Sequence, residues 1–193
     1  MNVNLKQLYG NWSDGYALDR HVISSTPIGY NDHGHMQFDT KRTDAGEALF
    51  LLKYRARWDQ AAPLAQAVFT HIVPKFPTVG LVIPMPPSTI RSRQPVFEVA
   101  SELAQLMGLT SWESVLAKAA GSASLKNLGT KQEKVNALAG RITVSDAIPT
   151  LGKWNALLVD DLFDSGASME AATAALKTYS KIDSVYVVAL TWR

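Results

Sequence analysis

Two adjacent carboxylates, Asp160 and Asp161, follow the apolar run Ala156-Leu157-Leu158-Val159. The run is too apolar for an exposed strand, so we expect a buried parallel strand whose carboxyl end carries the acid pair. Open α/β sheets place their ligand crevices at such ends. There, two carboxylates can accept hydrogen bonds from vicinal hydroxyls and help to hold a hydrated divalent cation. The pattern predicts a site for a sugar diol.

The next residues form a short turn of hydroxyl and small side chains that leads into a helical pattern from Met169 to Tyr179. Backbone N–H groups at a helix start, together with the Ser165 and Ser168 hydroxyls, suit a phosphate monoester. Gly166 lets the backbone approach such an anion closely. The acid pair and the turn together therefore indicate a phosphorylated sugar.

Residues 156–168 resemble the phosphoribosyl diphosphate signature of type I phosphoribosyltransferases, except that Phe163 stands where a smaller aliphatic residue is commoner. The resemblance implies that Asp160 and Asp161 contact the ribose hydroxyls and a magnesium ion, directly or through those hydroxyls or water. A receiver domain also has paired aspartates after a strand, but it carries them near its N-terminus. The residues that would cradle the 5-phosphate are Asp164, Ser165, Gly166, Ala167 and Ser168.

A diphosphate needs a second loop, after an earlier strand of the same sheet. Residues 83–88 occupy that place and precede Arg91 and Arg93. The X-Pro bonds make a cis peptide accessible, and a cis or strained turn would aim successive N–H groups inward. A Pro-rich turn with two solvated arginines is the alternative. The predicted diphosphate contacts are Met85, Pro86, Pro87, Ser88, Arg91 and Arg93.

The order of these segments resembles the ComF family of competence-associated, phosphoribosyltransferase-like proteins, over about residues 46–193. A chain without cysteine cannot have the zinc ribbon that often begins such proteins. Asp164 replaces their usual Thr and matches the 6-oxopurine phosphoribosyltransferases, where this residue assists proton transfer. Asp164 is thus either a catalytic base or a cap of the following helix.

A Gly-, Ser-, Ala- and Lys-rich segment between residues 118 and 129 has little to bury and indicates a mobile loop. Thr130 and Glu133 have the spacing of a capping box, which predicts a short helix after the loop. The resemblance implies that such a loop closes over the diphosphate and excludes water. Its candidate lysines are Lys118, Lys126, Lys131 and Lys134, for which a solvated loop face is the alternative.

Residues 1–45 are rich in Gly, Asp, His, Ser and aromatic residues and are interpreted as a small N-terminal cap or hood. In 6-oxopurine enzymes, residues after the last core strand recognise the base, and this sequence ends at Arg193, so we expect a base to meet this cap instead. The aromatic candidates for stacking are Trp12, Tyr16, Tyr30 and Phe38, although core packing is the simpler role. The pair His33 and His35, with His21, is a weak candidate for zinc.

The composition is that of an ordinary globular domain: 193 residues, of which 47% are hydrophobic and 19% charged. The formal charge of +2 gives no basis for general nucleic-acid or membrane-surface binding. Absence of cysteine excludes disulfides and thiolate metal sites and agrees with a cytoplasmic location. No apolar run approaches the ~18 residues of a transmembrane span.

Helical patterns from residue 47 and over 63–72, 95–107, 130–139 and 169–179 alternate with strand patterns at 78–84, 112–117, 155–160 and 184–191. This alternation predicts an α/β fold with a mostly parallel sheet flanked by helices, as in the type I phosphoribosyltransferase core. We expect that core over residues 46–193.

We therefore expect a magnesium-dependent phosphoribosyltransferase that moves ribose 5-phosphate from phosphoribosyl diphosphate to a nitrogen nucleophile, a nucleobase or an amine. The alternative is a non-catalytic regulatory or competence-associated protein that binds phosphoribosyl diphosphate or a nucleotide. The missing C-terminal hood motivates that alternative. The sequence leaves open whether the protein forms a homodimer.

Overall fold

A computed structural model describes residues 1–89, 91–119, 129–138 and 140–193. Its centre is a five-stranded sheet in the order β1-β2-β9-β8-β5. Neighbouring strands are parallel, except that β1 pairs antiparallel with β2. The predicted mostly parallel α/β sheet is confirmed. In sheet order the strands are β1 (Lys6–Gln7), β2 (Asp14–Arg20), β9 (Ile182–Trp192), β8 (Trp154–Phe163) and β5 (Leu81–Pro84).

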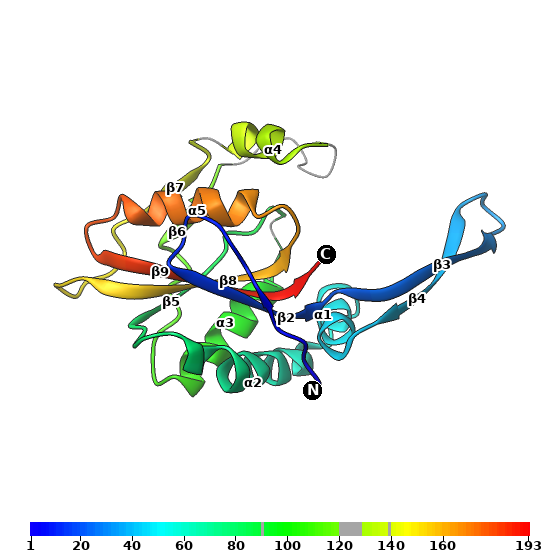
Figure 1. The fold of residues 1–193 in the computed structure, drawn as a ribbon, viewed down its shortest axis with the longest axis horizontal. Coiled ribbons are helices and arrows are strands. Elements are labelled where there is room, and N and C mark those ends of the chain that lie inside the picture. The colour runs from blue at the N-terminus through cyan, green and yellow to red at the C-terminus, as the bar shows by residue number, and fades with distance from the viewer. Residues whose placement is uncertain (90, 120–128, 139) are drawn as a thin grey trace.

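Successive residues of the central strands enter two different apolar cores. In β8, Leu157 and Val159 belong to one core, and Ala156 and Leu158 belong to the other. Because successive side chains of a strand point to opposite faces, a sheet covered on both sides needs an unbroken apolar run. One face is covered by α1, α2 and α3, and the other by α5 (Figure 1). These helices are α1 (Asp44–Tyr54), α2 (Ala61–His71), α3 (Pro95–Leu106) and α5 (Ala167–Lys177).

Local signals start the helices near the site. The Gly46 N–H donates to Oγ1 of Thr43, the N-cap of α1, at 3.0 Å, and Pro95 occupies the first turn of α3. Before α4 (Lys131–Leu138), the Glu133 N–H donates to Thr130 Oγ1 at 3.2 Å and the Thr130 N–H donates to the Glu133 carboxylate at 2.9 Å. The predicted capping box is confirmed.

The N-terminal 45 residues are divided between two sheets. Strands β1 and β2 lie in the central sheet, whereas β3 (Val22–Tyr30) and β4 (Met36–Arg42) form a hairpin that extends away from the body (Figure 1). The proposed boundary at residue 45 stays a prediction. No helix within the described ranges is long and apolar enough to cross a bilayer.

The segment that carries α4 leaves and rejoins the body through two short antiparallel strands. Strand β6 (Leu116–Lys118) overlaps the end of the strand expected over 112–117, whereas the sequence predicted no strand at β7 (Ile142–Val144). The remaining short elements are β6 (Leu116–Lys118), β7 (Ile142–Val144) and the 3-10 helices η1 (Trp58–Gln60) and η2 (Val73–Lys75).

Candidate active site

The acid pair lies at the carboxyl end of β8, in a cavity of about 330 Å³. Strand register places it there: Asp160 pairs with Ala189 of β9, and Val159 pairs with Pro84 of β5. The Met85 N–H then donates to the Val159 carbonyl at 2.8 Å, so the chain leaving β5 enters the cavity beside the pair. The predicted residues that line this cavity are Met85, Pro86, Pro87, Ser88, Arg91, Lys118, Asp160, Asp161 and Ser168.

Asp160 is poorly solvated for a carboxylate. Burial, and next the charge of Asp161, raise its pKa to about 7, while the Asp161 N–H bond and the charges of Lys53 and Lys118 act in the opposite direction. The N–H of Asp161 donates to Asp160 Oδ1 at 2.8 Å. A cation bound in the cavity would therefore stabilise the ionised form of Asp160.

Asp161 is held by Lys53, which lies outside the predicted site motifs. Lys53 Nζ donates to Asp161 Oδ2 at 2.6 Å. On the other side, the Thr191 hydroxyl donates to the Asp161 carbonyl at 3.0 Å and lies 3.2 Å from His21 Nδ1. Since the hydroxyl has one proton, the imidazole must be the donor in the second bond. Lys53 lies 108 positions before Asp161, so no local sequence signal indicated this contact.

Two of the expected cationic residues, Lys118 of β6 and Arg91, line the cavity beside the loop that follows β5 (residues 85–89, the β5 loop). Lys118 Nζ lies 2.9 Å from Ser88 Oγ, and burial lowers the pKa of this lysine. Arg91 Nη1 donates to the Lys53 carbonyl at 3.3 Å. The described residues contain no cis peptide, so the cis form considered for this turn is not observed, and a trans chain forms this part of the cavity wall.

Arg93 does not line the cavity. Its Nε and Nη2 atoms donate to the two Glu98 carboxylate oxygens at 2.7 and 2.6 Å, and its guanidinium lies 4.5 Å from the Trp58 ring centre. The guanidinium of Arg93 is therefore already engaged by Glu98 of α3 and Trp58 of η1. Arg91 is thus the arginine of this segment that the structure brings to the acid pair.

Gly166 is required by the turn that precedes α5. Its φ is +81°, and a Cβ at this position would lie 3.0 Å from Cε2 of Phe163. The Phe163 ring in turn contacts the ring of the buried Trp12 edge-on, with centroids 6.2 Å apart. The unusual Phe163 therefore has a structural partner, which supports the turn from beneath.

Among the described residues, no side chain caps the N-terminus of α5, so the N–H groups of its first turn remain available to a ligand. The helix-capping alternative for Asp164 is therefore not seen. Asp164 Oδ2 instead accepts from Lys134 Nζ of α4 at 2.7 Å. Lys126 lies outside the described residues, as does the side chain of Lys131.

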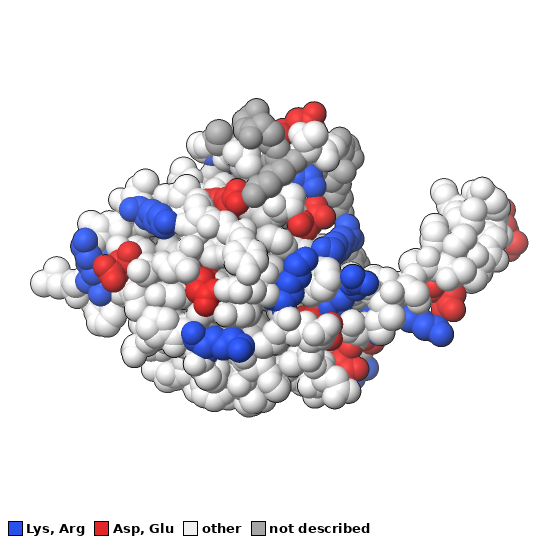
Figure 2. All heavy atoms as spheres, in the orientation of Figure 1, with Lys and Arg blue, Asp and Glu red and all other residues white. Residues whose placement is uncertain are grey.

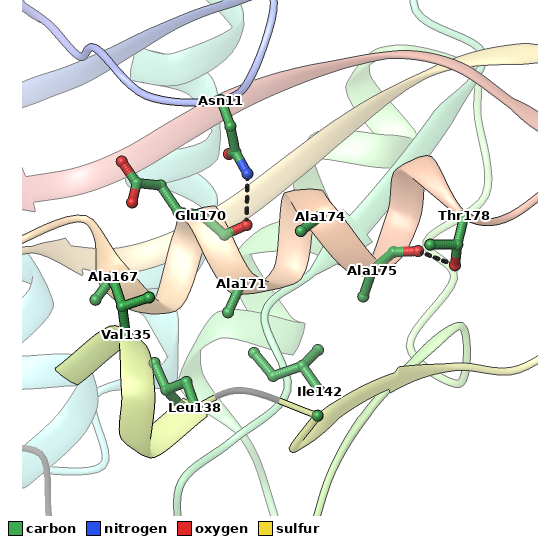
Figure 3. Close-up of a pocket in the computed structure, with 11 residues that line it drawn as sticks. Asn11, Val135, Leu138, Ile142, Ala167, Glu170, Ala171, Ala174, Ala175 and Thr178 are labelled. Atoms are coloured by element: carbon green, nitrogen blue, oxygen red, sulfur yellow. Dashed lines mark hydrogen bonds between the residues drawn. The ribbon is translucent and has the colours of Figure 1, made fainter. Parts of the chain in front are cut away.

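An open apolar hollow of about 450 Å³ separates α4 from α5. In Figure 3, Val135 and Leu138 of α4 lie toward the alanine-rich side of α5. Asn11 closes one edge, where its side chain donates to the Glu170 carbonyl at 2.9 Å (Figure 3). Helix α4 therefore packs incompletely on α5, and the Lys134 ion pair is a specific tie between α4 and the turn.

The N-terminal aromatic residues do not line the cavity. Trp12 is buried in the core, Tyr16 packs on the other core, and Tyr30 and Phe38 are 72% and 54% exposed on the hairpin. Tyr54, which was not selected, lines the cavity with its side chain 57% exposed. No cluster of three or more His, Cys, Asp or Glu residues suited to a metal occurs in the described ranges, so the structure does not assemble the histidine site considered above.

Positive charge gathers where the hairpin joins the sheet (Figure 2). Lys6 and Arg20 lie over the Trp192 ring, 3.8 and 4.8 Å from its centre, at the carboxyl end of β9. Burial first, and then the charges of nearby basic residues including Arg193, lower the pKa of His21. This edge of the sheet favours an anionic ligand.

Asp160 and Asp161 fit a magnesium ion that arrives with a diphosphate better than a protein-only cage. They supply two carboxylates, and no third acidic or histidine ligand joins them in the described part of the chain. Magnesium commonly keeps several waters and uses one or two carboxylates plus substrate phosphates. The cavity provides the two carboxylates of that donor set, beside the β5 loop.

Comparison with known proteins finds no matching family model and no matching curated protein. Solved structures do match. Adenine phosphoribosyl transferase from Trypanosoma brucei, solved with AMP, pyrophosphate and ribose-5-phosphate, is 9% identical, with 98% of this chain and 74% of that chain covered and a TM-score of 0.52. The Saccharomyces cerevisiae adenine enzyme is 15% identical over 88% and 83%, with a TM-score of 0.43. The first likeness confirms the predicted type I phosphoribosyltransferase fold.

Proposed function

We propose that this protein is a phosphoribosyltransferase that replaces the diphosphate of phosphoribosyl diphosphate with a nitrogen nucleophile. One observation carries the proposal. The carboxylates of Asp160 and Asp161, the β5 loop and Ser168 of the α5 turn surround one cavity at the carboxyl edge of the sheet. A diol, a diphosphate and a phosphate monoester are bound by groups of these three kinds.

The sugar is oriented by β8 and the turn that follows it. Asp160 and Asp161 accept hydrogen bonds from the ribose hydroxyls. The 5-phosphate lies against the first-turn N–H groups of α5, where the helix dipole favours an anion and Ser165 and Ser168 add hydroxyl donors. Gly166 provides the positive φ of this turn and leaves room for the Phe163 ring.

Departure of the diphosphate is the step with the largest charge to stabilise. Ser88, Arg91 and Lys118 line the wall on that side, and their donors face the leaving group. Magnesium held by Asp160 and Asp161 would neutralise part of the diphosphate charge. Arg93 has no part in this proposal because Glu98 engages it.

The acceptor is the least constrained partner. Tyr54 and Leu162 line the cavity and give a planar ring a surface to stack on. Asp164 takes the proton of the attacking nitrogen, which requires that Lys134 release its carboxylate. The acceptor class is a nucleobase or an amine.

Two measurements test the proposal. Calorimetry with magnesium and phosphoribosyl diphosphate should show binding that D160A/D161A abolishes. A panel of nucleobases and amines should then yield diphosphate with at least one acceptor. Absence of binding refutes the proposal, and binding without diphosphate release from any acceptor would instead favour the non-catalytic ligand-binding alternative.

A further inference from the structure

We propose that Lys53 is a positioning residue for Asp161 and the resident counterion of the acid pair, which the divalent cation and the ribose hydroxyls replace when substrate binds. This inference rests on the proposed function. It adds α1 to the elements that build the site.

The contact is close and sheltered. Lys53 Nζ lies 2.6 Å from Asp161 Oδ2, and the two side chains are only 21% and 23% exposed. Both line the cavity that contains the β5 loop. Exposed ion pairs contribute little, but a partly desolvated pair is less screened by solvent and salt.

The position of Lys53 links the two halves of the site. It lies in the last turn of α1, where a helix dipole favours a cation, and its carbonyl accepts a hydrogen bond from Arg91. Its ammonium contacts the sugar-binding acid, while its backbone contacts the diphosphate side. A lysine here can leave Asp161 and remain beside the charge of a bound diphosphate.

Competition follows from the shared atom. Asp161 Oδ2 accepts a hydrogen bond from the Lys53 ammonium group. A cation or a hydroxyl that uses the same oxygen must displace that bond. The ammonium therefore weakens binding of a metal alone, because it neutralises the pair, but strengthens binding of an anionic substrate, because it adds positive charge to the cavity.

If Lys53 only held α1 against β8, its substitution would have a different effect. Leu49 and Leu52 anchor α1 with side chains only 1% exposed, so the helix does not depend on Lys53 for its place. Loss of a tie would disorder the site and weaken the metal and the substrate together. Loss of a counterion changes the two affinities in opposite directions.

The test compares wild type with K53M, K53Q and K53R. Mn²⁺ alone is titrated by electron paramagnetic resonance, and phosphoribosyl diphosphate with magnesium by calorimetry. We expect K53M and K53Q to bind Mn²⁺ several-fold tighter and phosphoribosyl diphosphate roughly 10-fold more weakly, and K53R to stay near wild type. The matched control is K181M, which removes an ion pair with Asp146 at the opposite end of β8.

Two results overturn the inference: Mn²⁺ affinity that is unchanged or lower in both neutral variants, or K53R that behaves like K53M. The use of two neutral variants keeps the test valid if one of them folds poorly. If wild type fails to bind phosphoribosyl diphosphate, the proposed function fails, whereas the Mn²⁺ titration still decides whether Lys53 is the counterion.

Discussion

Replacing Asp160 with Asn should stabilise the ligand-free protein, by an amount that grows with pH. The substitution removes the charge but keeps the side-chain size and an Oδ1 acceptor for the Asp161 N–H, which now donates at 2.8 Å. D160N therefore isolates the cost of ionising this carboxyl group inside the cavity.

The sign follows from the raised pKa. Burial and the charge of Asp161 move the pKa of Asp160 from 3.8 to about 7, so the folded protein holds this proton more tightly than the unfolded chain does. Stability is therefore lost as pH rises from about 4 to about 7 and is level above that range. The Asn side chain does not titrate and carries no such loss.

The magnitude comes from the same shift. A rise of the Asp160 pKa from 3.8 to about 7 corresponds to about 4 kcal/mol at pH 8, and to about 1–2 kcal/mol at pH 5, where the unfolded carboxyl is already ionised. Asp160 lines an open cavity, so these are upper values. The advantage of D160N should grow by up to about 2–3 kcal/mol between pH 5 and pH 8.

Thermal unfolding in EDTA at pH 5, 6, 7 and 8 measures this difference. For a chain of this length the expected growth in the Tm gap is about 5–10 °C. D183N, at an exposed position of β9, is the control and should show no comparable trend. A D160N advantage that is constant or shrinks as pH rises would refute the reasoning. The same variant should lose binding of phosphoribosyl diphosphate.

Of three further variants, the first two probe supports of the site and the third probes an ion pair at the opposite end of β8. G166A should lower the Tm and weaken phosphoribosyl diphosphate binding by more than about 10-fold. The reason is that a non-glycine residue at this positive φ costs ~1–2 kcal/mol and the new methyl group meets Phe163. G152A is the control for backbone strain without the clash, because Gly152 has a φ of +109° and open space around its Cβ position. K134M should change stability by less than ~1 kcal/mol but weaken the salt dependence of ligand binding, and an unchanged salt slope would contradict a role for this lysine near the phosphate. For D146N, the Tyr179 hydroxyl and then Lys181 lower the Asp146 pKa below 3.8, so wild type should be the more stable near neutral pH and lose that advantage as acid titration passes below pH 4.

The sheet and the acid pair were predictable because their determinants are local. Leu157, Leu158 and Val159 alternate between two cores, and that double burial is written in an unbroken apolar run. The capping box at Thr130 and Glu133 likewise needs only a spacing of three residues. Such signals require no knowledge of what lies across the fold.

Contacts between distant segments were not predictable in the same way. Lys53 meets Asp161 across 108 positions, and only the packing of α1 against the sheet brings them together. Trp12 was a candidate surface for stacking a base, but its contact with Phe163 makes it a support of the turn that precedes α5. The sequence position of Arg93 predicted a diphosphate contact, but its guanidinium instead donates two hydrogen bonds to the carboxylate of the nearby Glu98.

These contacts indicate why the ligand-free site is stable despite its concentration of acid groups. Asp161 and Asp164 each contact a lysine, from α1 and from α4, and Lys118 places a third positive charge near Asp160. The three lysines come from segments outside β8 and α5, so the proposed ligand, on replacing these contacts, would release the three lysine side chains from the acids together. Under the proposed function, binding of phosphoribosyl diphosphate is therefore linked to the positions of these three charges.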